Sequence, residues 1–568
     1  KVKQISLADT DFSSATLTEF VQSVRWETAG VTRLTLDSNG IFGELWGDGD
    51  VKEADKFVAD CDAFLAALKD SNIVTLSLQK TGIGPLTLRK LATSLPAAVE
   101  ALAVGANPIG TEGGNILIEA IQSSNLKTID IGKPLPLQGK YESDTADLAD
   151  SGMGPGQVVI LAWWLTTDAA AAVYEVNVSM NDIGVDGAKA LGDVISGSSL
   201  KCLIIGPKST RLPVNDGDVT ELNFEGQEFS PVEVTLVAAA TSTLAASVEV
   251  IKLDGNPIGA PVVSVKPGAE TGVDVKKGVF AAVDGRFGLV TGDPDSVEEV
   301  QLRWLDDGGE SEWTKVNKLT SVVASRADLI EDYSHIQSLG EALSGSKVHT
   351  YGLANCNFNP VSLATFVESV RWADAALTSI NCLANKFGEE DLATLLTAIE
   401  GTSVRSLCGL TEGQTTADFS GQNLGPIDMK IMAAEYGFQG FIAAIARLSL
   451  SGNMIFSTHV VPDGLTKLEE IKWRKQNRKP ETEDLSGLIA LCDVLPNLKN
   501  PIGLDLSKCG LAVNGLTTVA KAIQVGAAVN FLTLDSIGNK RDRKTYTLAT
   551  GEEKGQQTDA NHGNPRLG

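Results

Sequence analysis

The residues that carry most enzyme chemistry are few and scattered in this sequence. The four histidines, His335, His349, His459 and His562, have no serine or cysteine motif beside them, so no nucleophile–base pair is indicated. No phosphate-binding G-x-x-x-x-G-K-[ST] loop, H-E-x-x-H helix, C-x-x-C pair or calcium-loop spacing occurs. We therefore expect a protein that is not an enzyme, with no catalytic residue, no cofactor and no metal site.

One basic segment could bind a partner. The chain has a formal net charge of −25, and the run from Lys472 to Lys479 stands out against that acidity. Trp473 could anchor this run on an acidic protein or another anionic surface. The alternative is a solvated helix face whose cations pair with neighbouring glutamates. The candidate partner-binding residues are Lys472, Trp473, Arg474, Lys475, Arg478 and Lys479.

Four aromatic residues form a second candidate site. They lie among short β-like runs that turn signals such as Asp284-Gly285 and Asp293-Pro294-Asp295 separate. Aromatic rings can enclose a methylated Lys or Arg through the ring quadrupole. A module of roughly fifty residues also needs large rings simply to fill its core, which is the interpretation that we favour. The four candidates are Phe280, Phe287, Trp304 and Trp313.

A recurring apolar pattern accounts for most of the chain and must position these candidates. In Leu34-x-Leu36-x-x-Asn39-x-Ile41, two alternating apolar residues predict a short strand with one buried face. The Asn is suited to satisfy backbone groups where the chain turns away. Helical apolar spacing follows such strands, and successive strands start about 26 to 29 residues apart. The same pattern starts at Leu102, Val176, Ile251 and Leu448.

The segment Asn181–Ile195, N-D-I-G-V-D-G-A-K-A-L-G-D-V-I, resembles the ribonuclease-inhibitor-like subtype of leucine-rich repeats. The resemblance implies an α/β solenoid with parallel strands on its concave face and helices on its convex face. It implies structural or adaptor roles only, because shape defines that family. The strand residues that would face the concave side are small and polar, so partner binding is expected elsewhere on the chain.

Insertions interrupt the pattern. After Ile131, Ile205 and Leu407 we predict β-hairpins that protrude from one rim, and Tyr546 could start another. The run Trp304-Leu305-Asp306-Asp307-Gly308 and a later Trp resemble small SH3-like barrels of the Tudor or Mib/Herc2 type. The predicted domains are an N-terminal repeat array (1–264), an inserted SH3-like β-barrel (265–320), a C-terminal repeat array (321–540), and a hairpin start or poorly ordered tail (541–568).

Composition limits the setting and the partners. The seven cysteines are widely spread, which predicts unpaired buried thiols and favours an intracellular location. The sequence contains no run of 18 apolar residues, so no transmembrane segment is predicted. The acidity argues against nucleic acid as a partner. We expect a noncatalytic protein-binding scaffold or a structural subunit of a larger assembly. The alternatives are a self-associating structural protein of a fibre or coat, and a reader of a modified peptide through the inserted barrel.

Overall fold

The computed structural model of the chain divides into two compact bodies. The N-terminal body comprises Lys1–Leu222, Gln227–Val248 and Glu341–Ser346. The C-terminal body comprises Asn223–Gly226, Glu249–Gly340 and Lys347–Gly568. The structure describes residues 2–26, 28–47, 49–283, 286–295, 297–305, 309–456, 484–511, 513–535 and 545–549.

The predicted α/β class is confirmed, because short strands alternate with helices and neighbouring strands run parallel. In the first sheet of the N-terminal body, Leu34 lies opposite Leu76, Leu76 opposite Leu102, and Leu102 opposite Ile129. These four side chains are almost fully buried, so the first apolar residue of each repeat forms one continuous row. The strands are β1 (Gln4–Ser6), β2 (Arg33–Thr35), β5 (Thr75–Ser77), β6 (Ala101–Ala103), β7 (Thr128–Asp130) and β8 (Pro134–Pro136).

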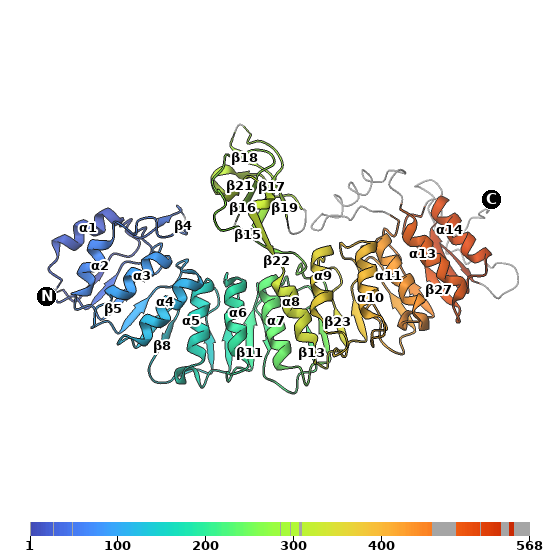
Figure 1. Cartoon of the computed structure of the whole chain (residues 1–568), viewed down its shortest axis with the longest axis horizontal. Helices are drawn as coiled ribbons and strands as arrows, with labels where there is room; N and C mark the ends of the chain where they lie inside the picture. The colour runs from blue at the N-terminus through green and yellow to red at the C-terminus, as the bar shows by residue number, and fades with distance from the viewer. Residues whose placement is uncertain are drawn as a thin grey trace. The chain divides into compact units, whose positions relative to one another are not determined.

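Helices connect these strands and pack on one another. In the N-terminal body, α4, α5, α6 and α7 lie side by side (Figure 1). Glycine permits one close approach, since a Cβ on Gly114 of α4 would lie 2.5 Å from the carbonyl oxygen of Gly156 in α5. The helices of this body are α1 (Ser14–Ser23), α2 (Asp62–Lys69), α3 (Pro85–Ser94), α4 (Gly110–Gln122), α5 (Pro155–Leu165), α6 (Gly184–Ile195) and α7 (Pro231–Thr243), with the 3₁₀ turn η1 (Asp168–Ala170).

The hairpins expected after Ile131 and Ile205 are present, but they do not protrude from a rim. Strand β8 pairs antiparallel with β7, and β12 pairs antiparallel with β11, so each second strand extends its sheet at the edge. After Leu407 the described residues form only isolated bridges at Ser406 and Cys408 in place of a hairpin. The second sheet of the N-terminal body contains β9 (Thr145–Asp147), β10 (Glu175–Asn177), β11 (Cys202–Ile205) and β12 (Thr210–Pro213).

The remaining parallel strands form two further sheets with the same alternation of strand and helix. The hairpin expected around Tyr546 is present, because β29 pairs antiparallel with β28. One sheet has β13 (Glu221–Asn223), β14 (Val250–Lys252), β23 (Thr350–Gly352) and β24 (Ser379–Asn381); the other has β25 (Thr416–Asp418), β26 (Arg447–Ser449), β27 (Ile502–Asp505), β28 (Val529–Asp535) and β29 (Thr545–Ala549). The helical segments are α8 (Ser334–Leu343), α9 (Pro360–Ser369), α10 (Glu389–Ile399), α11 (Pro426–Gly437), η4 (Phe441–Ala444), α13 (Ser486–Val494), η6 (Leu495–Asn497) and α14 (Val513–Gln524).

Antiparallel strands replace the repeat between Val262 and Asp332, a wider span than 265–320. Strand β15 pairs with β22 from Val262 opposite Asp332 to Val265 opposite Leu329, and the two strands enclose the insert as a stem. Within the insert, four strands are ordered β19-β17-β16-β21, and β18 pairs with β20. The elements are β15 (Val262–Val265), β16 (Phe280–Val283), β17 (Arg286–Val290), β18 (Glu299–Val300), β19 (Leu302–Trp304), β20 (Thr314–Lys315), η2 (Val316–Lys318), β21 (Thr320–Val323), η3 (Arg326–Asp328) and β22 (Leu329–Asp332).

Candidate interaction surfaces

Where a repeat carries the asparagine after its strand, that side chain joins two neighbouring repeats. The Asn107 side chain is 3% exposed, and its Oδ1 accepts hydrogen bonds from the main-chain amides of Thr81 (2.9 Å) and Ile83 (3.1 Å). Its Nδ2 donates to the carbonyls of Leu78 (2.8 Å) and Val104 (3.1 Å). A primary amide both donates and accepts, so it can satisfy the turns of two repeats at once. Equivalent bridges are made by Asn39, Asn181, Asn256, Asn385 and Asn453.

Cysteine takes the asparagine position in two repeats. The thiols of Cys356 and Cys509 donate to the carbonyls of Leu253 and Leu450, each over 3.1 Å. All seven cysteines are free and buried. Burial raises the pKa of the Cys356 thiol, and it raises the pKa of Cys61 to about 12. The thiols of Cys61 and Cys356 therefore stay protonated near neutral pH and are poor nucleophiles.

Two buried carboxylates on α11 hold the place where the strand ladder is interrupted, between β24 and β25. The Asp428 carboxylate accepts from the main-chain amides of Ala384 and Gly425, both over 2.7 Å. Glu435 accepts from the amides of Leu407 (2.8 Å) and Ile442 (2.9 Å). Burial raises the pKa of Asp428 to about 6 and also raises the pKa of Glu435. Among the described residues, no cation forms an ion pair with either carboxylate.

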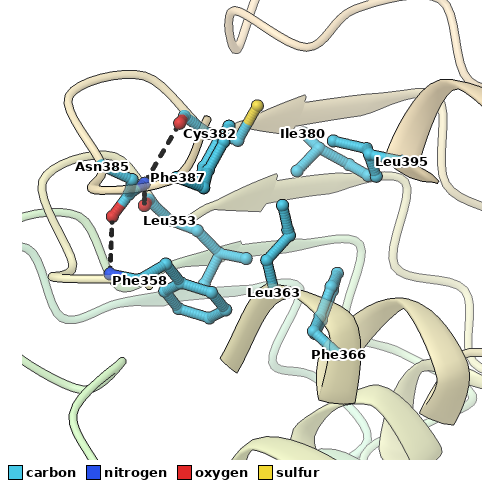
Figure 2. A pocket seen from close by; sticks show the side chains of 9 residues that line it. All are labelled: Leu353, Phe358, Leu363, Phe366, Ile380, Cys382, Asn385, Phe387 and Leu395. Atoms are coloured by element: carbon cyan, nitrogen blue, oxygen red, sulfur yellow. Dashed lines mark hydrogen bonds between the residues drawn. The ribbon is translucent and has the colours of Figure 1, made fainter. Parts of the chain in front are cut away.

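A small apolar cavity lies among β23, α9, β24 and α10 (Figure 2). Asn385 is its one polar lining side chain, and it is already bonded to the carbonyls of Leu353 and Cys382. We interpret the cavity as space between core side chains, because no lining group is free to recognise a ligand. The lining residues are Leu353, Phe358, Leu363, Phe366, Ile380, Cys382, Asn385, Phe387 and Leu395.

The four aromatic candidates of the insert do not converge on one site. Phe287 is buried in a cluster with Val323 and Leu329, and Phe280 packs against that cluster. Trp304 packs against a second cluster. The guanidinium carbon of Arg286 lies 4.5 Å from the centre of the Trp304 ring, so this ring face already has a cation over it.

Trp313 differs from the other three aromatic residues, since its side chain is 58% exposed. Every other tryptophan in the described part of the chain is at least partly buried. The sequence pattern groups Trp313 with the core aromatics, because strand alternation gives no signal in such short and irregular strands.

The exposed face of the parallel strands is polar, and two of its carboxylates bind groups of the neighbouring repeat. The Asp37 carboxylate accepts from the Ser77 hydroxyl over 2.7 Å and from the Gln79 amide over 2.8 Å. In the C-terminal body, Asp254 accepts from the Ala354 amide over 2.8 Å, and burial raises its pKa. These two carboxylates are therefore already hydrogen-bonded within the chain.

The sequence pattern missed one bridging residue, Asp55. A small antiparallel pair, β3 (Glu44–Leu45) and β4 (Val51–Glu53), follows the second repeat strand. Beyond it, the Asp55 carboxylate accepts from the main-chain amides of Gly84 (2.9 Å), Leu86 (2.8 Å) and Thr87 (2.9 Å) at the start of α3. Helix α3 begins at a Gly-Pro pair without a side-chain cap of its own, and that gap is the signal that could have revealed Asp55.

The basic candidate run from Lys472 to Lys479 lies outside the described residues, as does the tail from residue 550 onward. Where the structure describes the chain, no three side chains of metal-ligating type come together. No helix within those ranges combines the length and apolar character that crossing a bilayer requires. Comparisons with models of protein families and with curated protein sequences find no match to this chain.

Proposed function

We propose that the chain is a leucine-rich-repeat solenoid of the ribonuclease-inhibitor-like subtype that carries an inserted SH3-like barrel and acts as a noncatalytic protein-binding scaffold. The observation that carries the proposal is the row of bridging asparagines such as Asn107, each tying one repeat to the one before it. Repeats joined in this way bury a shared core and leave their surfaces for binding. We place the protein inside the cell, because its seven unpaired thiols suit a reducing compartment.

The surfaces support a binding role more than a chemical one. The cysteines are buried, the apolar cavity offers no free polar group, and the carboxylates of Asp37 and Asp254 beside the strands are already hydrogen-bonded within the chain. The insert instead presents an exposed ring, that of Trp313. We therefore expect partners to bind the insert or the basic run from Lys472 to Lys479.

A capture experiment from native material tests the scaffold role. The stem pairs Val265 with Leu329, so replacing residues 266–328 by an Asn-Gly turn removes the insert and keeps β15 and β22. We expect the intact chain to retain a defined protein, and the shortened chain to lose it if the insert is the binding part. The proposal is contradicted if neither the intact nor the shortened chain retains a protein, or if the chain turns over a substrate.

Self-association is the alternative, in which the chain is a structural protein of a fibre or coat. It predicts a mass that rises with concentration in sedimentation or light scattering. A single monomeric mass at high concentration removes this alternative and leaves the scaffold proposal intact.

A further inference from the structure

Trp313 directly precedes strand β20, which pairs with β18. Glu299 lies opposite Lys315, and Val300 lies opposite Thr314. Side chains alternate between the faces of a strand, and Val300 is buried in an apolar cluster of the insert. Glu299 and Lys315 therefore point away from that cluster, and the exposed Trp313 directly precedes β20. We call these three residues the Trp313 face.

An indole exposed to this extent is costly to hydrate and is typical of binding surfaces. The sequence that precedes it is acidic, since the segment from Asp293 to Glu312 contains eight acidic residues and one basic residue, Arg303. Arg303 is already paired with Glu310 over 3.5 Å. The exposed carboxylate of Glu312 directly precedes the ring. Lys315 offsets part of this charge and leaves the segment strongly negative.

The comparison with Trp304 indicates what is missing at Trp313. The chain supplies its own cation, Arg286, to the face of the Trp304 ring. Elsewhere in the described residues, cations lie over Trp46, Phe57 and Phe531, and none lies over Trp313. An exposed aromatic ring beside an acidic segment suits an external ammonium or guanidinium group, which gains from both.

We propose that the Trp313 face docks a cationic segment of a partner protein, an extended peptide bearing Arg or Lys. This inference rests on the scaffold function and names the chemistry of one partner. A cationic side chain of the peptide lies over the indole ring, and Glu299 and Glu312 attract the neighbouring positive charges. Lys315 repels a basic residue placed directly opposite it, which disfavours a peptide whose single basic residue lies there.

Binding of a labelled 12-residue Arg-Ser repeat peptide to the intact chain, followed by fluorescence anisotropy, tests the proposal. Trp313→Ala is expected to weaken binding at least tenfold, whereas Trp313→Phe keeps most of it. Glu312→Gln is expected to weaken binding about threefold and to lower its salt dependence. Leu86→Ala on α3 is the matched control, because Leu86 is 56% exposed and uncharged, and it should leave binding unchanged.

Two outcomes would overturn the proposal. One is equal binding by the Trp313→Ala and Leu86→Ala chains, which would mean general attraction to an acidic surface. The other is equal binding of a Gln-Ser peptide. Circular dichroism of Trp313→Ala shows whether the variant folds. The capture experiment separates the two proposals. If the chain that lacks residues 266–328 no longer captures the partner but the Trp313→Ala chain still does, the scaffold function stands and only the role of the Trp313 face is removed.

Discussion

Two kinds of junction between repeats solve the same problem with different chemistry. At Asn107, a neutral amide donates to and accepts from the turns of two repeats. Between β24 and β25, where the ladder is interrupted, the buried carboxyl groups of Asp428 and Glu435 accept hydrogen bonds from main-chain amides, without a paired cation in the described chain. The amide bridge is independent of pH, whereas the carboxylate bridge is linked to proton binding.

The sign of that linkage follows from the raised pKa of Asp428. The unfolded chain binds a proton at this residue only below about pH 4, whereas the folded chain binds it up to about pH 6. The contribution of Asp428 to stability is therefore fully present below pH 4 and is lost as the pH rises to 6. A shift of about two pKa units corresponds to about 2–3 kcal/mol.

The largest effect is expected at the amide bridge. Asn107→Ala leaves several buried backbone groups without partners and should lower the free energy of unfolding by about 3–5 kcal/mol. Urea unfolding measures the loss. Asn125→Ala is the control, since the exposed Asn125 side chain makes one bond to the Ala97 carbonyl over 3.1 Å. A loss below about 1 kcal/mol at Asn107 would contradict the role of the bridge.

The carboxylate bridge should respond to pH. Asp428→Asn removes the ionisation, so the stability of this variant relative to the native chain should improve by about 2–3 kcal/mol between pH 4 and pH 7. Urea unfolding at a series of pH values measures this difference. Asn125→Ala, which removes no ionisable group, serves as the control and should give a flat difference. A flat result for Asp428→Asn as well would show that its carboxyl group does not carry the linkage.

An intermediate effect on stability is expected at Asp55, a half-exposed carboxylate. Asp55→Ala removes the cap that α3 receives from outside the helix, and it should cost about 1–2 kcal/mol. Hydrogen exchange should increase first at the amides of Leu86 and Thr87. Unchanged protection at these two amides would contradict the capping role.

The smallest effect is expected where a thiol replaces the amide. Cys356→Ala loses a weak S–H hydrogen bond and should cost about 1 kcal/mol, well below the loss at Asn107. Urea unfolding of the two variants side by side provides the measurement. Equal losses would show that packing, and not hydrogen bonding, decides the strength of a junction.

The regular parts of the fold could be predicted because each repeat encodes its own strand, turn and bridge. Leu34, Leu76 and Leu102 follow a local pattern, and the register of the sheet places them in one row. Asp428 could not be assigned in this way. Three residues after Gly425 it matches an ordinary helix cap, and only the fold brings it to the Ala384 amide of another repeat.

The candidate surfaces were less predictable. Exposure separates Trp313 from Phe287, although both occur in short β-like runs of similar composition. The hairpins were found by sequence but misplaced, because no local signal states whether β8 leaves the sheet or closes its edge. The role of the basic run from Lys472 to Lys479 stays a prediction.

Strands β8 and β12 have a further consequence for the N-terminal body. Because each closes a sheet, the backbone ladder is divided into separate segments while the helices beside it stay in contact. A register slip in one segment cannot pass through hydrogen bonds into the next. Opening of a few strands is likewise confined to its own segment. The hairpins therefore confine local unfolding to one segment of the ladder, so a long chain can fray in one place while its remaining segments stay aligned.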